Sequence, residues 1–219
     1  MSISPVIQGW CPGALRPMQS GDGLVVRVRP MGGRLTPDHA RGIAGLASAH
    51  GNGLIDISAR ANVQLRGVTE ASQPAMIDGL QELGLLDESA AIEARRNVVV
   101  TPFWTAADPT LALATELTAA LAAPDAPALP GKFGFALDTA AAPALRDVSA
   151  DIWIETGPAG LLLATQAPLA KPVTAANAVA EALDLARWFI AAGGVTEGRG
   201  RMAALAQRRG LPEGFVAAR

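Results

Sequence analysis

Two hydrophobic periods alternate along the first 84 residues, and their order constrains the fold more than any other feature of the sequence. Apolar side chains recur at every second position in three segments, which predicts half-buried strands at 24–29, 54–58 and 62–67. Helical spacing predicts two helices, at 37–50 and 72–83. Thr36 before Pro37 is typical of a helix start, and Gly51 of a helix end. This β-α-β-β-α order predicts an α/β sandwich whose helices cover one face of a sheet.

The rest of the chain mixes helices and strands in a different order. Strands are predicted at 97–102, 132–137, 151–155 and 161–165, the last two forming a hairpin. Asp108-Pro109 is predicted to cap a helix that carries Leu113, Leu117 and Leu121, and two more helices are predicted at 174–193 and at about 201–209. Residues 87–94 are predicted to be a linker. The fold class is therefore α/β (α+β), with one domain over 1–88 and a second α/β domain over 95–219.

Composition excludes several classes of function. The chain has 219 residues, is 50% hydrophobic and carries a net charge of only −2, which argues against non-specific nucleic-acid binding. It has no apolar run of about 18 residues, so no membrane span is predicted. The first ten residues lack the charged and apolar regions of a signal peptide. A cytoplasmic location is expected.

Residues suited to metal binding or nucleophilic catalysis are scarce. The one cysteine, Cys11, excludes an internal disulfide and a four-thiolate cluster or zinc ribbon built by this chain alone. His39 and His50 are too few for a multi-histidine site. The segment 198–203, GRGRMA, has the form G-x-G-x-x-A, but that fingerprint works only after a strand, whereas here a predicted helix precedes it. No metal site and no catalytic residue is assigned.

Basic residues near strand ends are the candidate site. They are Arg60, Arg66, Arg96 and Lys132. Arg60 lies between two predicted strands, and Arg96 and Lys132 each lie where a polar loop meets an apolar strand. Any one of them could simply be a solvated surface residue. Several cations around one cavity would instead suit a ligand with many carboxylates, because the planar guanidinium binds carboxylates bidentately.

Several segments, in order along the chain, resemble one family. SARANVQLRGV (58–68) is similar to the T-x-R-x-x-x-Q-L-R-G segment of the nitrite/sulfite reductase ferredoxin-like half domain. ARRNVVVTP (94–102) and LPGKFGFAL (129–137) resemble the R-N-[VI] and L-P-x-K-F segments of the domain that follows it. Residues 10–28 and 48–60 are most similar to the precorrin-3B synthase branch, which belongs to cobalamin biosynthesis.

The resemblance implies a ferredoxin-like half domain followed by a nitrite/sulfite reductase-like α/β domain. It also implies a ligand, since the family binds uroporphyrinoid rings: sirohaem in the reductases and precorrin-3A in the cobalamin enzyme. Its ring-binding basic residues correspond to Arg60, Arg96 and Lys132. The reductase motif often has a second basic residue two places after the lysine, where this chain has Gly134.

The family's 4Fe-4S cluster, and its sirohaem or non-haem iron, imply a second half that carries the cluster cysteines. We therefore expect this chain to be one half of an active unit, with no cofactor bound by this chain alone. Its expected partner is a second copy or a separately encoded second half, with no nucleic acid and no membrane. Whether it is an oxidoreductase by itself stays open. The alternatives are a non-catalytic tetrapyrrole-binding or scaffold subunit, and half of a sulfite or nitrite reductase.

Overall fold

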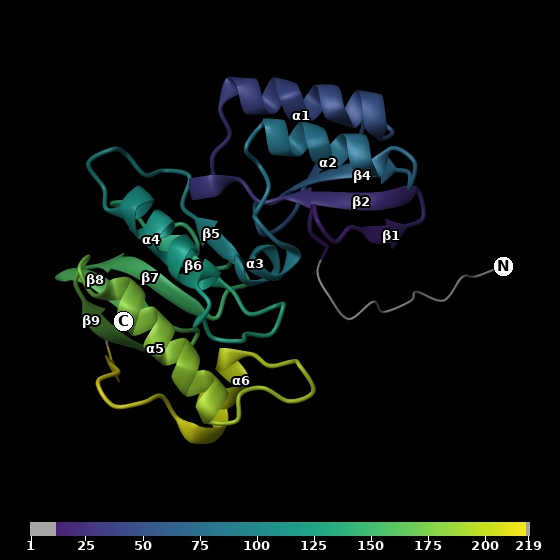
Figure 1. Cartoon of the computed structure of the whole chain (residues 1–219). Coiled ribbons are helices and arrows are strands. Elements are labelled where there is room, and N and C mark those ends of the chain that lie inside the picture. Colours follow the sequence, from purple (N-terminus) through teal and green to yellow (C-terminus); the bar gives the residue numbers. More distant parts are fainter. Residues whose placement is uncertain (1–11, 218–219) are drawn as a thin grey trace.

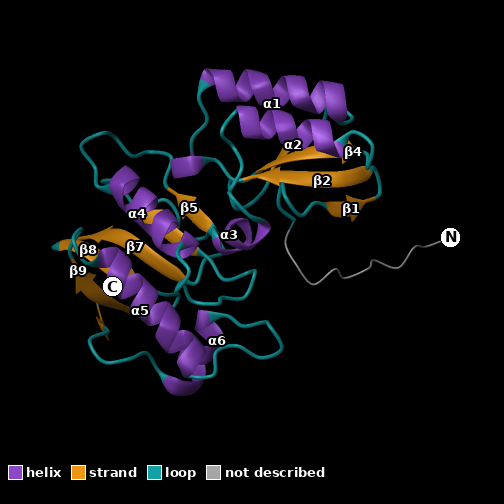
Figure 2. Ribbon diagram, viewed as in Figure 1, coloured by secondary structure: helices purple, strands orange, loops and turns teal. Residues whose placement is uncertain are grey.

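The computed structural model describes residues 12–217, which form two sheets (Figure 1, Figure 2). The first sheet is antiparallel with the order β1-β2-β4-β3. Its strands are β1 Met18–Ser20, β2 Gly23–Val28, β3 Ile55–Ile57 and β4 Val63–Val68. The mixture of helices and sheets confirms the predicted α+β class. The predicted domain boundaries, 1–88 and 95–219, stay a prediction, as do the expectations on Cys11, which lies outside the described residues.

Two helices cover one face of the first sheet, as the sequence predicts. They are α1 Pro37–His50 and α2 Gln73–Glu82, and Figure 1 shows them side by side. Thr36 begins α1 through a capping box: its side chain accepts a hydrogen bond from His39 N (3.1 Å), and Thr36 N donates to His39 Nδ1 (3.5 Å). The buried side chains of the helices and of β2 and β4 form one core. The two hydrogen bonds of the capping box give His39 a structural role.

The predicted burial of the strand around Ile55 is wrong. Ile55 is 39% exposed and Ile57 is 70% exposed, because β3 is the edge strand of the sheet and pairs only with β4. β4 lies inside the sheet, and its apolar residues Val63 and Leu65 are buried as predicted. Alternation therefore identified both strands but not which one lies at the edge.

The second sheet has the order β10-β9-β8-β7-β6-β5. Its strands are β5 Val98–Val100, β6 Phe135–Asp138, β7 Ile152–Gly157, β8 Gly160–Ala164, β9 Leu169–Val173 and β10 Val216–Ala217. β5, β6 and β7 run parallel, and the other neighbours are antiparallel. The hairpin β7–β8 matches the prediction, whereas the sequence analysis missed β1, β9 and β10.

Three helices complete the second core: α4 Thr110–Ala122, α5 Ala178–Ala191 and α6 Met202–Arg209. Figure 1 shows α4 and α5 on one face of the sheet. α5 begins at Ala178 rather than at Thr174, because Thr174 N instead donates to Asn177 Oδ1 (2.7 Å). No helix within residues 12–217 is long and apolar enough to cross a membrane.

The segment predicted as a linker contains a helix, α3 Ala90–Arg95. Ser89 caps it by accepting a hydrogen bond from Ile92 N (3.2 Å). The short 3-10 helix η1 Met31–Gly33 follows β2. η1 contacts β5 and α4, α3 contacts α4, and Figure 1 shows α3 between the two sheets.

Candidate functional site

The loop before β6 is held from both sheets. We call the first sheet with α1 and α2 the first unit, and the second sheet with α4, α5 and α6 the second unit. Asn97 Nδ2, just before β5, donates to the carbonyls of Gly131 (2.8 Å) and Phe133 (3.2 Å). Arg60 Nη2, from the first unit, donates to the carbonyl between them, that of Lys132 (3.0 Å). Three consecutive carbonyls are thus fixed by two side chains far apart in the sequence. We name residues 131–133 the Lys132 loop.

Arg60 projects from a tight turn between β3 and β4. Ala61 N donates to Ser58 O (2.9 Å), Ser58 N donates to Asn62 O (2.9 Å), and Ala61 adopts φ 55°. The turn directs the half-buried Arg60 toward the second unit, where Nη2 also lies 3.4 Å from Ser149 Oγ. Its Nε and Nη1 make no hydrogen bond with residues 12–217. Arg60 therefore bridges the two units and keeps donors free for a ligand.

Sequence analysis missed a second guanidinium at the same place. Arg201 Nη1 donates to Ser149 Oγ (3.2 Å), Nη2 donates to Ala150 O (2.9 Å), and Nε donates to the buried carboxylate of Asp151 (2.9 Å). Ser149 is therefore shared by Arg60 and Arg201. The sequence signal for this residue was the segment 198–203, GRGRMA, which was considered only as a possible dinucleotide-binding fingerprint.

Lys132 is exposed. Its ammonium group has no hydrogen bond or ion pair within the described part of the chain, although its carbonyl is held by Arg60. Because the backbone on either side is fixed by Asn97, the free charge is presented from a stable position. An exposed ammonium without a counter-charge is suited to binding an anion.

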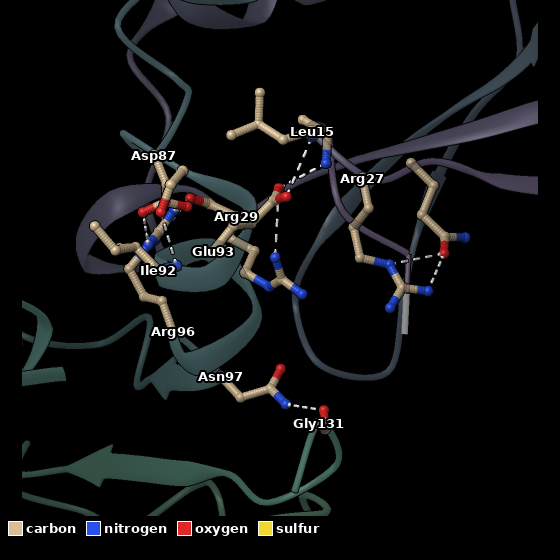
Figure 3. Close-up of polar contacts among 12 residues, drawn as sticks. Leu15, Arg27, Arg29, Asp87, Ile92, Glu93, Arg96, Asn97 and Gly131 are labelled. Carbon is tan, nitrogen blue, oxygen red and sulfur yellow. Dashed lines mark hydrogen bonds and ion pairs between the residues drawn. The ribbon is translucent and has the colours of Figure 1, made fainter. Parts of the chain in front are cut away.

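Arg96 is buried, and its guanidinium is bound by other residues of the chain. It is 6% exposed and forms two hydrogen bonds to Asp87, Nε–Oδ1 at 2.7 Å and Nη2–Oδ2 at 2.8 Å. Its Nη1 donates to the carbonyl of Arg29 (3.0 Å). Figure 3 shows this bidentate pair beside α3. The geometry makes Arg96 a positioning residue that joins the end of β2 to the start of the second unit.

Arg66 lies apart from the Lys132 loop. Its guanidinium binds Asp22 (Nη2–Oδ1 2.8 Å, Nε–Oδ2 3.0 Å) and Ser20 Oγ (3.2 Å), with Asp56 3.7 Å away. The hydrogen bond from Arg66 is the main cause that lowers the pKa of the exposed Asp22 carboxyl. Among the four predicted residues, the structure therefore brings the Arg60 guanidinium to the Lys132 carbonyl. Arg96 is bound to Asp87 and precedes Asn97, which holds the Lys132 loop. Arg66 is bound to its own acidic partners.

A cavity adjoins the Lys132 loop on the side of α3. Its volume is about 280 Å³, and Arg29, Glu93 and Gly131 are among its lining residues. Arg29 follows β2 and is only 5% exposed, and burial lowers its pKa although the Glu93 carboxylate opposes that effect. Figure 3 shows Arg29 beside Glu93, with Asn97 and Gly131 drawn beyond it. Sequence analysis treated Arg29 as one of the polar positions of a strand and missed its burial.

Metal-binding side chains are not grouped in the described structure. Between residues 12 and 217, no three His, Cys, Asp or Glu residues are placed to hold a metal ion together. An iron–sulfur cluster takes cysteine thiolates, and the one cysteine of the sequence is Cys11. The described residues therefore do not fit such a cluster, and no chemical step through one is derived below.

Comparison with known proteins defines the class of the first unit. Residues 16–83 match the family model described as the nitrite/sulfite reductase ferredoxin-like half domain, so this part of the chain is similar to that half domain. It contains α1, α2 and the sheet β1-β2-β4-β3. The predicted resemblance to that family is thus confirmed.

Three proteins are similar to parts of this chain. The chain is 36% identical over 156 residues to a precorrin-3B synthase from Sinorhizobium sp, which confirms the predicted resemblance to that branch. The match covers 70% of this chain and 34% of that protein, so it spans about a third of the relative's length. Ferredoxin–nitrite reductases from Zea mays and Oryza sativa subsp. japonica are each 34% identical over 80 residues, which is 36% of this chain and 14% and 13% of those proteins.

Proposed function

We propose that this chain acts in cobalamin biosynthesis as a precorrin-3B synthase-like protein that binds a polycarboxylated tetrapyrrole of the precorrin-3A type. The similarity to a precorrin-3B synthase over 156 residues supports the pathway. The Lys132 loop supports the ligand class, because the Arg60 guanidinium, which has no carboxylate partner among residues 12–217, binds the backbone of the residue that carries the free Lys132 ammonium. Arg201 shares Ser149 with Arg60 but is itself paired with Asp151. This convergence of cations is the observation that carries the proposal.

Each residue has a distinct role in this proposal. The Lys132 ammonium neutralises one carboxylate of the ring, and the free Nε and Nη1 donors of Arg60 bind a neighbouring one. Arg96 positions the site through Asp87 and the Arg29 carbonyl and does not touch the ligand. Contact between Arg66 and a ring carboxylate stays a prediction. None of these residues is assigned a proton transfer.

A titration with uroporphyrin III, an octacarboxylate ring, tests the proposal. Absorbance of the ring would be followed at low and at raised salt, and we expect saturable binding that weakens with salt. Arg60→Ala removes donors to a charged group, so its Kd should rise about tenfold or more. Lys132→Gln should raise the Kd several-fold and reduce the salt dependence.

Arg41→Gln is the matched control. It removes the same charge from an exposed pair with Asp38 on α1, outside the Lys132 loop, and should leave the affinity unchanged. Equal affinity of Arg60→Ala, Lys132→Gln and the control, with all three folded by circular dichroism, would refute the assignment of the loop. So would binding that raised salt does not affect.

The second candidate is a tetrapyrrole-binding subunit without chemistry of its own. The sequence has one cysteine, too few for the family's cluster, and this favours the second candidate. Supplying the purified chain with precorrin-3A, oxygen and a reductant separates the two candidates, since turnover would exclude the binding subunit.

The partner is also part of the proposal: either a second copy of this chain or a separately encoded second half. Sedimentation equilibrium of the purified chain distinguishes a homodimer from a monomer that needs another protein as its partner.

A further inference from the structure

Arg29 is a buried cation whose hydrogen-bonding capacity is not used. Its Nε and Nη1 are shielded from solvent and make no hydrogen bond with residues 12–217. Glu93 Oε1 lies 3.4 Å from Nη1, close enough for an ion pair but without hydrogen-bond geometry. A buried donor without an acceptor is costly, and one on a charged group more so. This burial indicates an acceptor that the chain itself does not supply.

Glu93 forms an ion pair with Arg29 but accepts no hydrogen bond from its Nε or Nη1, because backbone donors fix the orientation of the carboxylate. Oε1 accepts a hydrogen bond from Ala14 N (2.6 Å), and Oε2 accepts one from Leu15 N (3.1 Å). Gly13 packs so closely on this carboxylate that a Cβ at that position would clash with it. The Gly13–Leu15 segment thus fixes Glu93, and Figure 3 shows the carboxylate between Leu15 and Arg29. Glu93 cannot turn toward Arg29 without releasing two backbone donors.

The cavity beside Arg29 has room for the missing acceptor. It measures about 280 Å³, and its walls are Arg29, Glu93 and Arg16, the glycines 13 and 131, and alanines of α3. Ala94 and Gly131 are exposed, so the cavity is reached from solvent. Pockets for drug-sized ligands span about 300–1,000 Å³, so this cavity suits a small group and not a macrocycle.

We propose that this cavity is a carboxylate subsite in which the Arg29 guanidinium binds one carboxylate group, with Arg16 at the rim. A carboxylate is the acceptor that matches the planar guanidinium, and both groups need little space. Gly131 lines the cavity and precedes Lys132, and consecutive Cα atoms are about 3.8 Å apart. Resting on the function proposed above, the carboxylate is an acid side arm of the ring bound at the Lys132 loop.

Two variants test the subsite by independent means. Arg29→Gln removes the buried charge. Ala94→Leu leaves Arg29 intact and fills the cavity from an exposed helical position, where leucine is a good helix former. Arg41→Gln again controls for the loss of one charge. Each protein would be titrated with uroporphyrin III by absorbance and with citrate, a small free carboxylate, by calorimetry.

We expect both variants to bind uroporphyrin III at least about tenfold more weakly than the wild type and the control, whose affinities should agree. If the wild type binds the ring and both variants bind it equally well, the subsite is refuted and the proposed function stands. If the ring does not bind but citrate binds in a way that depends on Arg29 and Ala94, the proposed function fails and the cavity is a site for a free carboxylate. Binding of neither probe refutes both. Should Arg29→Gln fail to fold, Ala94→Leu decides the question.

Discussion

The buried pair of Arg96 and Asp87 gives the sharpest test of how the two units are joined. Both side chains are under a tenth exposed, and two charge-assisted hydrogen bonds connect them while a third joins Arg96 to the Arg29 carbonyl. Removing one member of a buried pair leaves the other charge without compensation, which costs about 3–5 kcal/mol. For a chain of 150–250 residues each kcal/mol lowers the Tm by about 2–4 °C, so each single variant should melt roughly 6–20 °C below the wild type.

A double-mutant cycle measures the coupling. Arg96→Ala, Asp87→Ala and the double variant would be unfolded in urea and followed by circular dichroism at neutral pH. Because the second substitution removes a charge that the first has already left unpaired, the double variant should be less destabilised than the sum of the singles, with a coupling of about 0.5–3 kcal/mol. Additive effects, or single variants within about 1 kcal/mol of the wild type that lose only uroporphyrin binding, would refute the positioning role and favour direct ligand contact by Arg96.

Two further predictions concern the first sheet. Arg66 lowers the pKa of Asp22 in the folded state, so the stabilisation is present above the carboxyl's ordinary pKa of 3.8 and is lost as the pH falls through the lower folded value. Urea unfolding between pH 7 and pH 2 measures this loss of stability in acid, which should be smaller in Arg66→Gln than in the wild type. An unchanged profile would contradict the assignment. Ile57 is exposed at the edge whereas Leu65 is fully buried, so Ile57→Ala should change the unfolding free energy by under about 0.5 kcal/mol and Leu65→Ala by about 2–5 kcal/mol, and similar losses would show that the edge strand is covered.

Local signals in the sequence identified most elements but not their surroundings. Thr36-Pro37 located the start of α1, since capping depends on neighbouring residues. Alternation located β3 and β4 but could not show that β3 is an edge strand, because strand order depends on the whole chain. α3 was missed because a six-residue helix inside a polar segment carries little periodicity.

The candidate site divides along the same line. Position alone identified Arg60 at the turn between two strands, but its acceptor is a carbonyl 72 residues away. Arg29 ends an alternating segment as a polar position, yet it is buried, because it lies just after β2 and against Glu93 of α3, which Ala14 N and Leu15 N hold. Likewise, no motif pairs Arg96 with Asp87. Contacts between the units depend on tertiary packing, which local patterns in a single sequence do not reveal.

The junction between the two units relies mainly on guanidinium-to-carbonyl hydrogen bonds, and this choice bears on function. Arg60 binds the Lys132 carbonyl, Arg96 the Arg29 carbonyl, and Arg34 the carbonyls of Pro102 (2.9 Å) and Trp104 (2.6 Å). A carbonyl does not titrate and arginine stays charged at any working pH, so these bonds persist where carboxylate pairs would weaken. At Arg60 the carbonyl also leaves the positive charge of the guanidinium without a counter-charge, unlike the carboxylate partners of Arg66 and Arg96. The bond from Arg60 therefore helps to hold the units together and keeps positive charge available at the Lys132 loop, which suits a ligand fringed with carboxylates.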